Sequence, residues 1–367
     1  MADWKTYKGQ YPWKIVPVVA KVTYNEGDKL ATIANPVWDE EHEFSGVPIT
    51  PTHIPCGYWS KNYVPSPTPA ELPCDWDIVA PQYGADTVNR PTDLIVFNNE
   101  IFAASSSSGY TLLKWNEVDA WEGLIPYVAA DACPALAILG TDLYGLGANI
   151  NLNKWDGISA WGRKVTHSGY YSSNFLTSYN SRLYTHEGSA GTIKLLEWDG
   201  AASWVDKGSY SAADAESIDS LIVFNGSLYL NTQAGLLKWN GTDTLSKVAD
   251  YITAGYCAVF NNELYMTSGV YLYKFSGSEW VLQSGTMEGS DGSRAIIDYF
   301  GHLLISGTTS GNTSLWLYED NAFRIAATND IDTINCLCVH NGRLYGSGDK
   351  VNNTDTGLLW RWSNIYA

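Results

Sequence analysis

Short apolar runs recur along most of the chain, and they come in pairs separated by two polar or glycine residues. The stretch LIVFNGSLYL at 221–230 has this pattern, and LIVFNNEIF at 94–102 nearly repeats it. Paired runs around Asn-Gly or Asn-Asn are typical of two antiparallel strands joined by a type I′ turn. The pattern therefore predicts a β-hairpin at each of these places.

The phrase occurs seven times. The copies are LIVFNNEIF (94–102), LAILGTDLY (136–144), FLTSYNSRLY (175–184), LIVFNGSLY (221–229), CAVFNNELY (257–265), IIDYFGHLL (296–304) and LCVHNGRLY (337–345). Their last residues are separated by steps of 42, 40, 45, 36, 39 and 41 residues. A period in this range indicates one supersecondary unit repeated in space.

Each copy is followed by two further runs. The first ends in an aromatic residue, as in LLKWNE, LNKWDG, LLEWDG, LLKWNG, LYKFSG, LWLYED and LLWRWS, and the second resembles AWEGLIPYV or SWVDKGSY. Four short strands about every 40 residues are typical of a β-propeller blade. The sequence therefore predicts an all-β fold, a seven-bladed β-propeller of four-stranded blades over residues 75–367.

The seventh copy lacks a fourth run, because its third run lies just before Ala367. A strand-like segment, DWDIVAPQYG (75–84), stands before the first copy. We expect residues 75–83 to supply the outer strand of the last blade, because this would join the two ends of the ring and remove an open seam.

The repeats resemble the broad propeller superfamily of kelch-like and WD-repeat proteins in architecture. The kelch Gly-Gly pair, the Gly-His…Trp-Asp signature and the Ser-x-Asp-x-Gly-x-x-Trp box of sialidases are absent, and SDGS at 290–293 is only a fragment of that box. The phrase L-Y…G…L-x-K-W-D/N-G is similar to propeller repeats of bacteriophage structural proteins and bacterial surface proteins. That resemblance implies a structural or recognition role.

Composition and charge exclude several classes of function. The chain has 22 Lys and Arg against 39 Asp and Glu, with a net charge of −17, so it has no basic footprint for nucleic acid. No apolar run is long enough to span a membrane, and the N-terminus lacks the apolar core of a signal peptide. Four of the six cysteines lie in strand-like runs, which predicts buried free thiols and synthesis in a reducing cytosol. No P-loop, HExxH or nucleophile elbow is present.

The loops differ between the two ends of the strands. The hairpins within a blade are short and uniform, whereas the other connections vary, as in SSSSGY (105–110), GLGANIN (145–151), HEGSAGT (186–192), TTSGNT (308–313) and GSGDKVNNTDTG (346–357). Binding residues commonly lie on loops held by a rigid scaffold. We expect the variable face to recognise a ligand or partner through Asp131, Asp214, Glu216, Asp219, Asp291, Asp330, Asp332 and Tyr110.

These carboxylates have three interpretations. They are solvated loop residues, they bind Ca²⁺ or another hard cation through oxygen ligands, or two of them form an acid–base pair of the kind that hydrolyses glycosides. The first interpretation implies no cofactor and no catalytic residue, and it is the one favoured here.

Residues 1–74 lie outside the repeat. Seven prolines between 48 and 73 predict an extended arm, and Trp13, Tyr58, Trp59 and Tyr63 would pack on the propeller or on a neighbouring subunit. His42, His53, Cys56 and Cys74 fit no standard zinc spacing. The sequence leaves undecided whether Cys56 and Cys74 form a disulfide.

These features favour a non-enzymatic structural and recognition protein. The most concrete form is a bacteriophage virion component, such as a tail, fibre or decoration protein, docked to other virion proteins by its arm. The propeller would then face a glycan or protein of the host surface. One alternative is a soluble carbohydrate-binding lectin that stacks aromatic side chains on sugars. A second alternative is a hydrolase or lyase that acts on polysaccharides with acidic residues around the channel.

Overall fold

The computed structural model describes one compact unit between Asp75 and Trp362. The described residues are 75–80, 91–105, 110–126, 133–167, 173–189, 191–212, 218–252, 255–283, 286–287, 292–309, 312–319, 321–329, 331–350 and 358–363. The expected arm, with Trp13, Tyr58, Trp59, Tyr63, Cys56 and Cys74, lies outside this part of the chain.

The described residues form 28 strands and one short 3-10 helix, η3 (Ala148–Ile150). The strands are β1 (Asp75–Ala80), β2 (Pro91–Phe97), β3 (Glu100–Ser105), β4 (Tyr110–Trp115), β5 (Trp121–Pro126), β6 (Ala135–Leu139), β7 (Asp142–Leu146), β8 (Leu152–Trp155), β9 (Trp161–Val165), β10 (Thr177–Tyr179), β11 (Arg182–Ser189), β12 (Thr192–Trp198), β13 (Trp204–Ser211), β14 (Ile218–Phe224), β15 (Ser227–Thr232), β16 (Gly235–Trp239), β17 (Leu245–Ala249), β18 (Tyr256–Phe260), β19 (Glu263–Ser268), β20 (Tyr271–Phe275), β21 (Trp280–Leu282), β22 (Gly292–Tyr299), β23 (His302–Thr309), β24 (Asn312–Glu319), β25 (Ala322–Asn329), β26 (Ile331–His340), β27 (Arg343–Lys350) and β28 (Leu358–Ser363).

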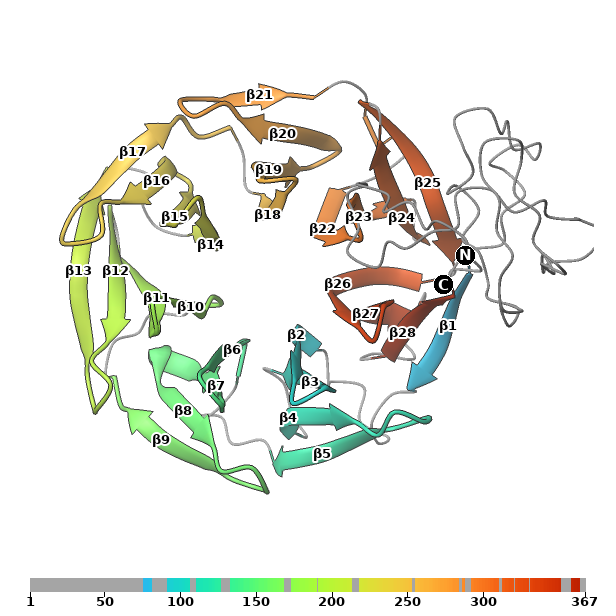
Figure 1. The fold of residues 1–367 in the computed structure, drawn as a ribbon, viewed down its shortest axis with the longest axis horizontal. Coiled ribbons are helices and arrows are strands. Elements are labelled where there is room, and N and C mark those ends of the chain that lie inside the picture. Colours follow the sequence, from blue (N-terminus) through green and yellow to red (C-terminus); the bar gives the residue numbers. More distant parts are fainter. Residues whose placement is uncertain are drawn as a thin grey trace, which may run out of the picture. The chain divides into compact units, whose positions relative to one another are not determined.

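These strands form seven antiparallel four-stranded sheets arranged in a ring (Figure 1). Blade 1 is β2–β5, blade 2 is β6–β9, blade 3 is β10–β13, blade 4 is β14–β17, blade 5 is β18–β21 and blade 6 is β22–β25. The first strand of each blade lies nearest the centre of the ring. The predicted seven-bladed β-propeller is confirmed.

Blade 7 combines both ends of the described chain. Its strand order is β1-β28-β27-β26, so β1 is the outer strand beside β28. This confirms the closure predicted for residues 75–83, although the strand itself covers Asp75–Ala80. Val79 and Ala80 are buried in a core shared with blade 1, so the join is held by packing as well as by strand pairing.

The inner hairpins are the repeated phrase. Each joins the first and second strands through two residues, from Asn98–Asn99 in blade 1 to Asn341–Gly342 in blade 7. Both turn residues have positive φ in every blade except blade 2, where Gly140 alone does (φ 62°). Positive φ at both positions defines the type I′ turn, which favours Asn and Gly because side chains strain it.

The W-N/D-G phrase forms the second kind of hairpin, between the third and fourth strands. Asn240 Oδ1 accepts hydrogen bonds from the backbone N–H groups of Thr242, Asp243 and Thr244 at 2.9–3.1 Å. Asn116 and Asp156 make the same three bonds in blades 1 and 2. The polar residue of this phrase therefore satisfies the turn backbone and belongs to the scaffold.

Strand pairing continues further into several variable segments than the sequence predicts. His186–Ser189 belong to β11 and Thr192 to β12, so the HEGSAGT segment is largely strand. The TTSGNT and GSGDKVNNTDTG segments likewise begin inside β23 and β27. Backbone hydrogen bonds pair these small and polar residues, and hydrophobic periodicity cannot detect such pairing.

Aromatic residues hold neighbouring blades together at the ends of the inner hairpins. In the junction between blades 3 and 4, Tyr179 and Tyr184 meet Trp239, with ring centroids 5.4–6.3 Å apart. Phe97 and Phe102 meet Trp155 in the same way between blades 1 and 2. We call this repeated arrangement the junction triad. It explains the spacing of aromatic residues in the repeat, since each ring bridges units about 40 residues apart.

Candidate functional site

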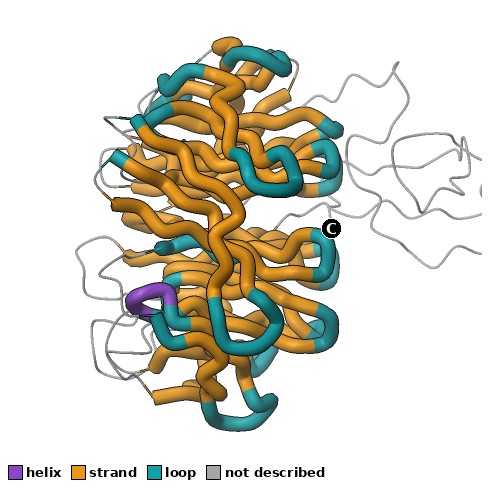
Figure 2. Tube along the Cα trace, turned by 90° about the vertical axis from the view of Figure 1, so that its left-hand side faces the viewer, coloured by secondary structure: helices purple, strands orange, loops and turns teal. Residues whose placement is uncertain are grey.

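The two faces of the ring are built differently. The hairpin face carries the turns between first and second strands and between third and fourth strands. The loop face carries the turns between second and third strands and the connections between blades. In Figure 2 the larger turns, coloured teal, gather on one side of the ring, while η3, coloured purple, lies on the other. The prediction of one uniform and one variable face agrees with these strand bounds.

Most predicted binding residues lie outside the described part of the chain. These are Asp131, Asp214, Glu216, Asp291 and Asp330. The backbone of Asp332 lies in β26 rather than in a connection, and its side chain is outside the description. The structure therefore locates only Asp219 and Tyr110 among the predicted loop-face residues.

Tyr110 is the first residue of β4 and is partly buried. Its ring covers Gly123 of β5, where an added Cβ would lie 2.6 Å from the ring carbons. Gly123 thus allows the ring to lie flat on its own blade, and Tyr110 packs against the core shared by blades 7 and 1. This packing gives Tyr110 a structural role at the margin of the loop face.

Asp219 lies at the loop-face end of β14, at an irregularity in the pairing with β15. Burial raises the pKa of its carboxyl group to about 6, against a backbone N–H bond from Gly255 that lowers it. Its Oδ2 atom is buried without a hydrogen-bond partner among the described residues. Asp219 therefore bonds the next blade and is held in an environment that disfavours its charge.

Asp93 is a second carboxylate of this kind, and the sequence prediction did not include it. Its Oδ2 accepts a hydrogen bond from the Leu136 N–H of blade 2 at 2.9 Å, and burial raises its pKa to about 6. Burial raises the pKa values of the Cys133, Cys336 and Cys338 thiols, and the nearby Asp93 charge raises them further. The sequence does hold a signal for Asp93. It is a carboxylate directly before the repeated phrase, where other copies have Ser220, Ala295 or Cys336.

The four described cysteines are free thiols, and three of them are buried. Burial raises the pKa of Cys257 and of Cys338 to about 12. Thiolates are the reactive form, so these residues behave as small apolar side chains. This confirms the predicted free thiols at Cys133, Cys336 and Cys338, whereas Cys257 is only partly buried.

One Ser–His pair has the spacing of a nucleophile and a base. The Ser173 Oγ and His186 Nδ1 atoms are 2.7 Å apart, and the Thr185 hydroxyl donates to Ser173 Oγ at 2.9 Å. Ser173 and His186 are 2% and 4% exposed, and burial lowers the pKa of His186 to about 3. A substrate cannot reach this hydroxyl, so the network joins β11 to the segment before β10.

Three exposed tyrosines border the loop face of blades 4 and 5. Tyr251 follows β17, Tyr256 begins β18 and Tyr271 begins β20, and each is about 40% exposed. The Tyr271 ring is 6.4 Å from the Tyr273 ring. Exposed tyrosine offers a large contact area with a polar tip, which suits recognition of proteins and sugars.

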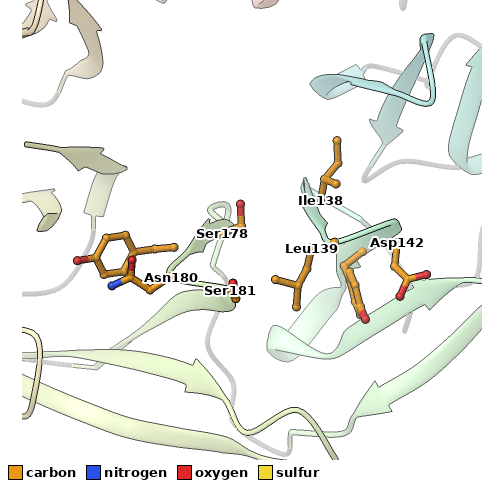
Figure 3. Close-up of a pocket in the computed structure, with 9 residues that line it drawn as sticks. Ile138, Leu139, Asp142, Ser178, Asn180 and Ser181 are labelled. Atoms are coloured by element: carbon orange, nitrogen blue, oxygen red, sulfur yellow. The ribbon is translucent and has the colours of Figure 1, made fainter. Parts of the chain in front are cut away.

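A shallow hollow of about 470 Å³ lies on the hairpin face between blades 2 and 3. Ile138 and Leu139 form one wall, and Ser178, Asn180 and Ser181 form the other (Figure 3). Asp142 and Tyr144 also line it. Sequence reasoning assigned this face to the scaffold and did not predict the hollow.

Within the described segments, no three His, Cys, Asp or Glu side chains gather as a metal site. None of the described helices is long and apolar enough to cross a membrane. The expected Ca²⁺ ligands lie mainly in segments outside the description, so that interpretation stays a prediction.

Comparison with solved structures places the fold among known β-propellers. The chain is similar to the WD40 β-propeller domain of Doa1 with 14% identity and a TM-score of 0.58, covering 80% of this chain and 99% of that one. It is similar to YCF48 from Cyanidioschyzon merolae with 14% identity and a TM-score of 0.56, covering 78% and 98%. YCF48 bound to D1 peptide matches with 12% identity and a TM-score of 0.57, covering 80% and 99%.

No protein-family model matches the sequence, and no curated protein matches it. At these identities the similarity shows the fold alone. The fold is that of a seven-bladed β-propeller, the architecture of the propeller superfamily that the repeat resembles.

Proposed function

We propose that this protein is a non-enzymatic recognition propeller that binds a partner through its loop face. The contrast between the two faces carries this proposal. Every inner hairpin turn has two residues, whereas the connections of the loop face range from the single residue 330, between β25 and β26, to residues 166–176, between β9 and β10. A rigid ring with one varied face can present diverse loops at little cost in stability.

The chemistry of the described residues supports binding rather than catalysis. The Ser–His pair is sealed, the thiols are protonated, and each of the two perturbed aspartates bonds the backbone of the neighbouring blade. The repeat tryptophans that a lectin would use for stacking are mostly buried at the blade junctions. Tyr251, Tyr256 and Tyr271 provide the exposed aromatic surface instead. A propeller of this fold is recorded with a bound peptide, YCF48 with D1 peptide.

In its finer form, the proposal places the protein in a bacteriophage virion. The arm of residues 1–74 would anchor it to other virion proteins, and the loop face would contact a host-surface protein or glycan. The Asn-, Gly- and Trp-rich repeats and the Pro-rich segment between residues 48 and 73 motivate this placement. Electron microscopy of particles purified from the source, combined with mass spectrometry of their proteins, tests it. The protein should appear in stoichiometric amount, and its recovery only in the particle-free fraction would refute the virion placement.

The recognition role has a separate test. The purified propeller should bind to cells of the host organism or to extracts of their surface. The Tyr256→Ala/Tyr271→Ala double variant should lose at least about tenfold in affinity, since exposed aromatic contacts dominate such interfaces. Val118→Ala, on the hairpin face, is the matched control because Val118 is 73% exposed. Equal binding by all three proteins would exclude the tyrosines of the loop face from recognition.

A further inference from the structure

The hollow between blades 2 and 3 lies at the junction where, among the seven described blades, the inner strand ends without an aromatic ring. At the other six junctions the inner strand ends in an aromatic ring, namely Phe97, Tyr179, Phe224, Phe260, Tyr299 or His340. Blade 2 ends instead in Leu139. The remaining two members of its triad, Tyr144 and Trp198, are still stacked at 5.3 Å.

Without the ring, the end of the inner strand is less buried in blade 2 than in blade 1. Phe97 ends its inner strand with its ring 5.8 Å from Phe102 and 6.2 Å from Trp155. Leu139 is only partly buried against the corresponding Tyr144 and Trp198. The adjoining Gly140 carries no side chain, and a Cβ there would meet nothing within 4 Å.

The opposite wall of the hollow is polar and small. Ser178 and Ser181 flank the Tyr179–Asn180 pair at the end of β10, and both are exposed. Tyr179 itself packs toward Tyr184 and Trp239 of the next junction, so its ring does not fill the hollow. The hollow thus combines an apolar wall, Ile138 and Leu139, with hydroxyl and amide groups across from it (Figure 3).

We infer that this hollow binds an aromatic side chain with a polar tip, tyrosine or tryptophan, presented by a partner polypeptide. The ring would lie against Leu139 and Tyr144, where other junctions hold a ring of their own. Its hydroxyl or indole N–H would bond Ser178, Asn180 or Ser181. Asp142, held by Lys154 at 2.7 Å, is the charged residue of the lining. With a chain charge of −17, charge complementarity favours Lys or Arg beside the bound aromatic residue.

This inference concerns the hairpin face and does not depend on the proposed role of the loop face. Its test uses N-acetyl-tyrosinamide and N-acetyl-tryptophanamide as probes, with binding followed by backbone amide shifts in NMR spectra of the full chain. The shifts should centre on Leu139, Ser178 and Ser181, with a dissociation constant on the order of 1 mM for probes of this size.

Leu139→Phe restores the absent ring and should weaken probe binding at least tenfold. Ser178→Tyr fills the hollow from its exposed wall and should do the same if Leu139→Phe does not fold. Val118→Phe, which adds a ring elsewhere on the hairpin face, should bind like the wild type. Two results would overturn the inference: wild-type spectra without shifts at the lining residues at 5 mM probe, a concentration about fivefold above that estimate, or unchanged binding by both filling variants. Self-association of the wild type that Leu139→Phe abolishes would also overturn it, in favour of a second copy of this chain.

Discussion

Two tryptophans at the same repeat position give a sharp test of how the blades are held together. Trp198 stacks on Tyr144 at 5.3 Å and Trp239 stacks on Tyr184 at 5.4 Å, and both are buried. They differ in the third residue of the junction, which is Tyr179 beside Trp239 and Leu139 beside Trp198, and in the indole N–H group. Trp239 Nε1 donates to the Lys207 carbonyl at 3.0 Å, whereas Trp198 Nε1 is buried without a partner among the described residues.

Replacing each tryptophan by phenylalanine should therefore have unequal effects. Both variants lose ring contact with a tyrosine of the second strand, which contributes about 1–2 kcal/mol, and Trp239→Phe also reduces the contact with Tyr179. Trp239→Phe also removes a hydrogen bond worth about 0.5–1.5 kcal/mol, whereas Trp198→Phe removes an unpaired buried donor whose desolvation costs about 1–3 kcal/mol. The two N–H effects add, so we expect Trp239→Phe to be more destabilising than Trp198→Phe by about 1.5–4.5 kcal/mol.

Urea denaturation followed by circular dichroism measures both free energies of unfolding. The slope of the unfolding free energy against urea concentration must be the same for all variants, because a changed slope would signal loss of two-state behaviour. Trp239→Ala should lower the free energy of unfolding by about 3–5 kcal/mol. This value gives the contribution of one complete ring for comparison. If Trp198→Phe costs as much as Trp239→Phe or more, the hydrogen-bond reasoning at the junctions is wrong.

Three further predictions concern the turns and the inner strands. Glu117 has φ 62° where other blades have Gly157, Gly200 or Gly241, so Glu117→Gly should raise the free energy of unfolding by about 0.5–1 kcal/mol, measured by urea denaturation; a loss of stability would contradict the strain. Asn240→Ala removes three turn hydrogen bonds and should cost about 1–2 kcal/mol by thermal unfolding, against no change for Thr242→Ser. Asp93 has its pKa raised from 3.8 to about 6, so the folded state holds its proton longer than the unfolded chain. Its contribution is therefore fully present below pH 4 and is lost as pH rises through 6. Asp93→Asn, which keeps an acceptor for Leu136, should flatten this decline and stabilise by about 1–3 kcal/mol at pH 8; a wild-type pH profile in the variant would refute the desolvation of Asp93.

The repeat unit could be predicted because its signals are local. Asn225 and Gly226 determine the turn because they adopt positive φ with less backbone strain than other residues. The alternation of apolar and polar residues on both sides determines the strands. The seven blades and the closing strand predicted at residues 75–83, observed as β1 (Asp75–Ala80), then follow from counting the copies and from the need to complete the last blade. The strand ends were less predictable, as in HEGSAGT, because backbone pairing holds small polar residues that show no periodicity.

The sequence by itself determined the fold, because turn chemistry and hydrophobic period act over a few residues. The tertiary structure decided which side chains are buried and where a hollow is left, because burial and charge depend on neighbours about 40 residues away. Asp93 reads as an ordinary strand residue until the Leu136 amide and the cysteines of two blades surround it. Leu139 reads as one more apolar residue, and only the rings at the other junctions show that it leaves a place unfilled.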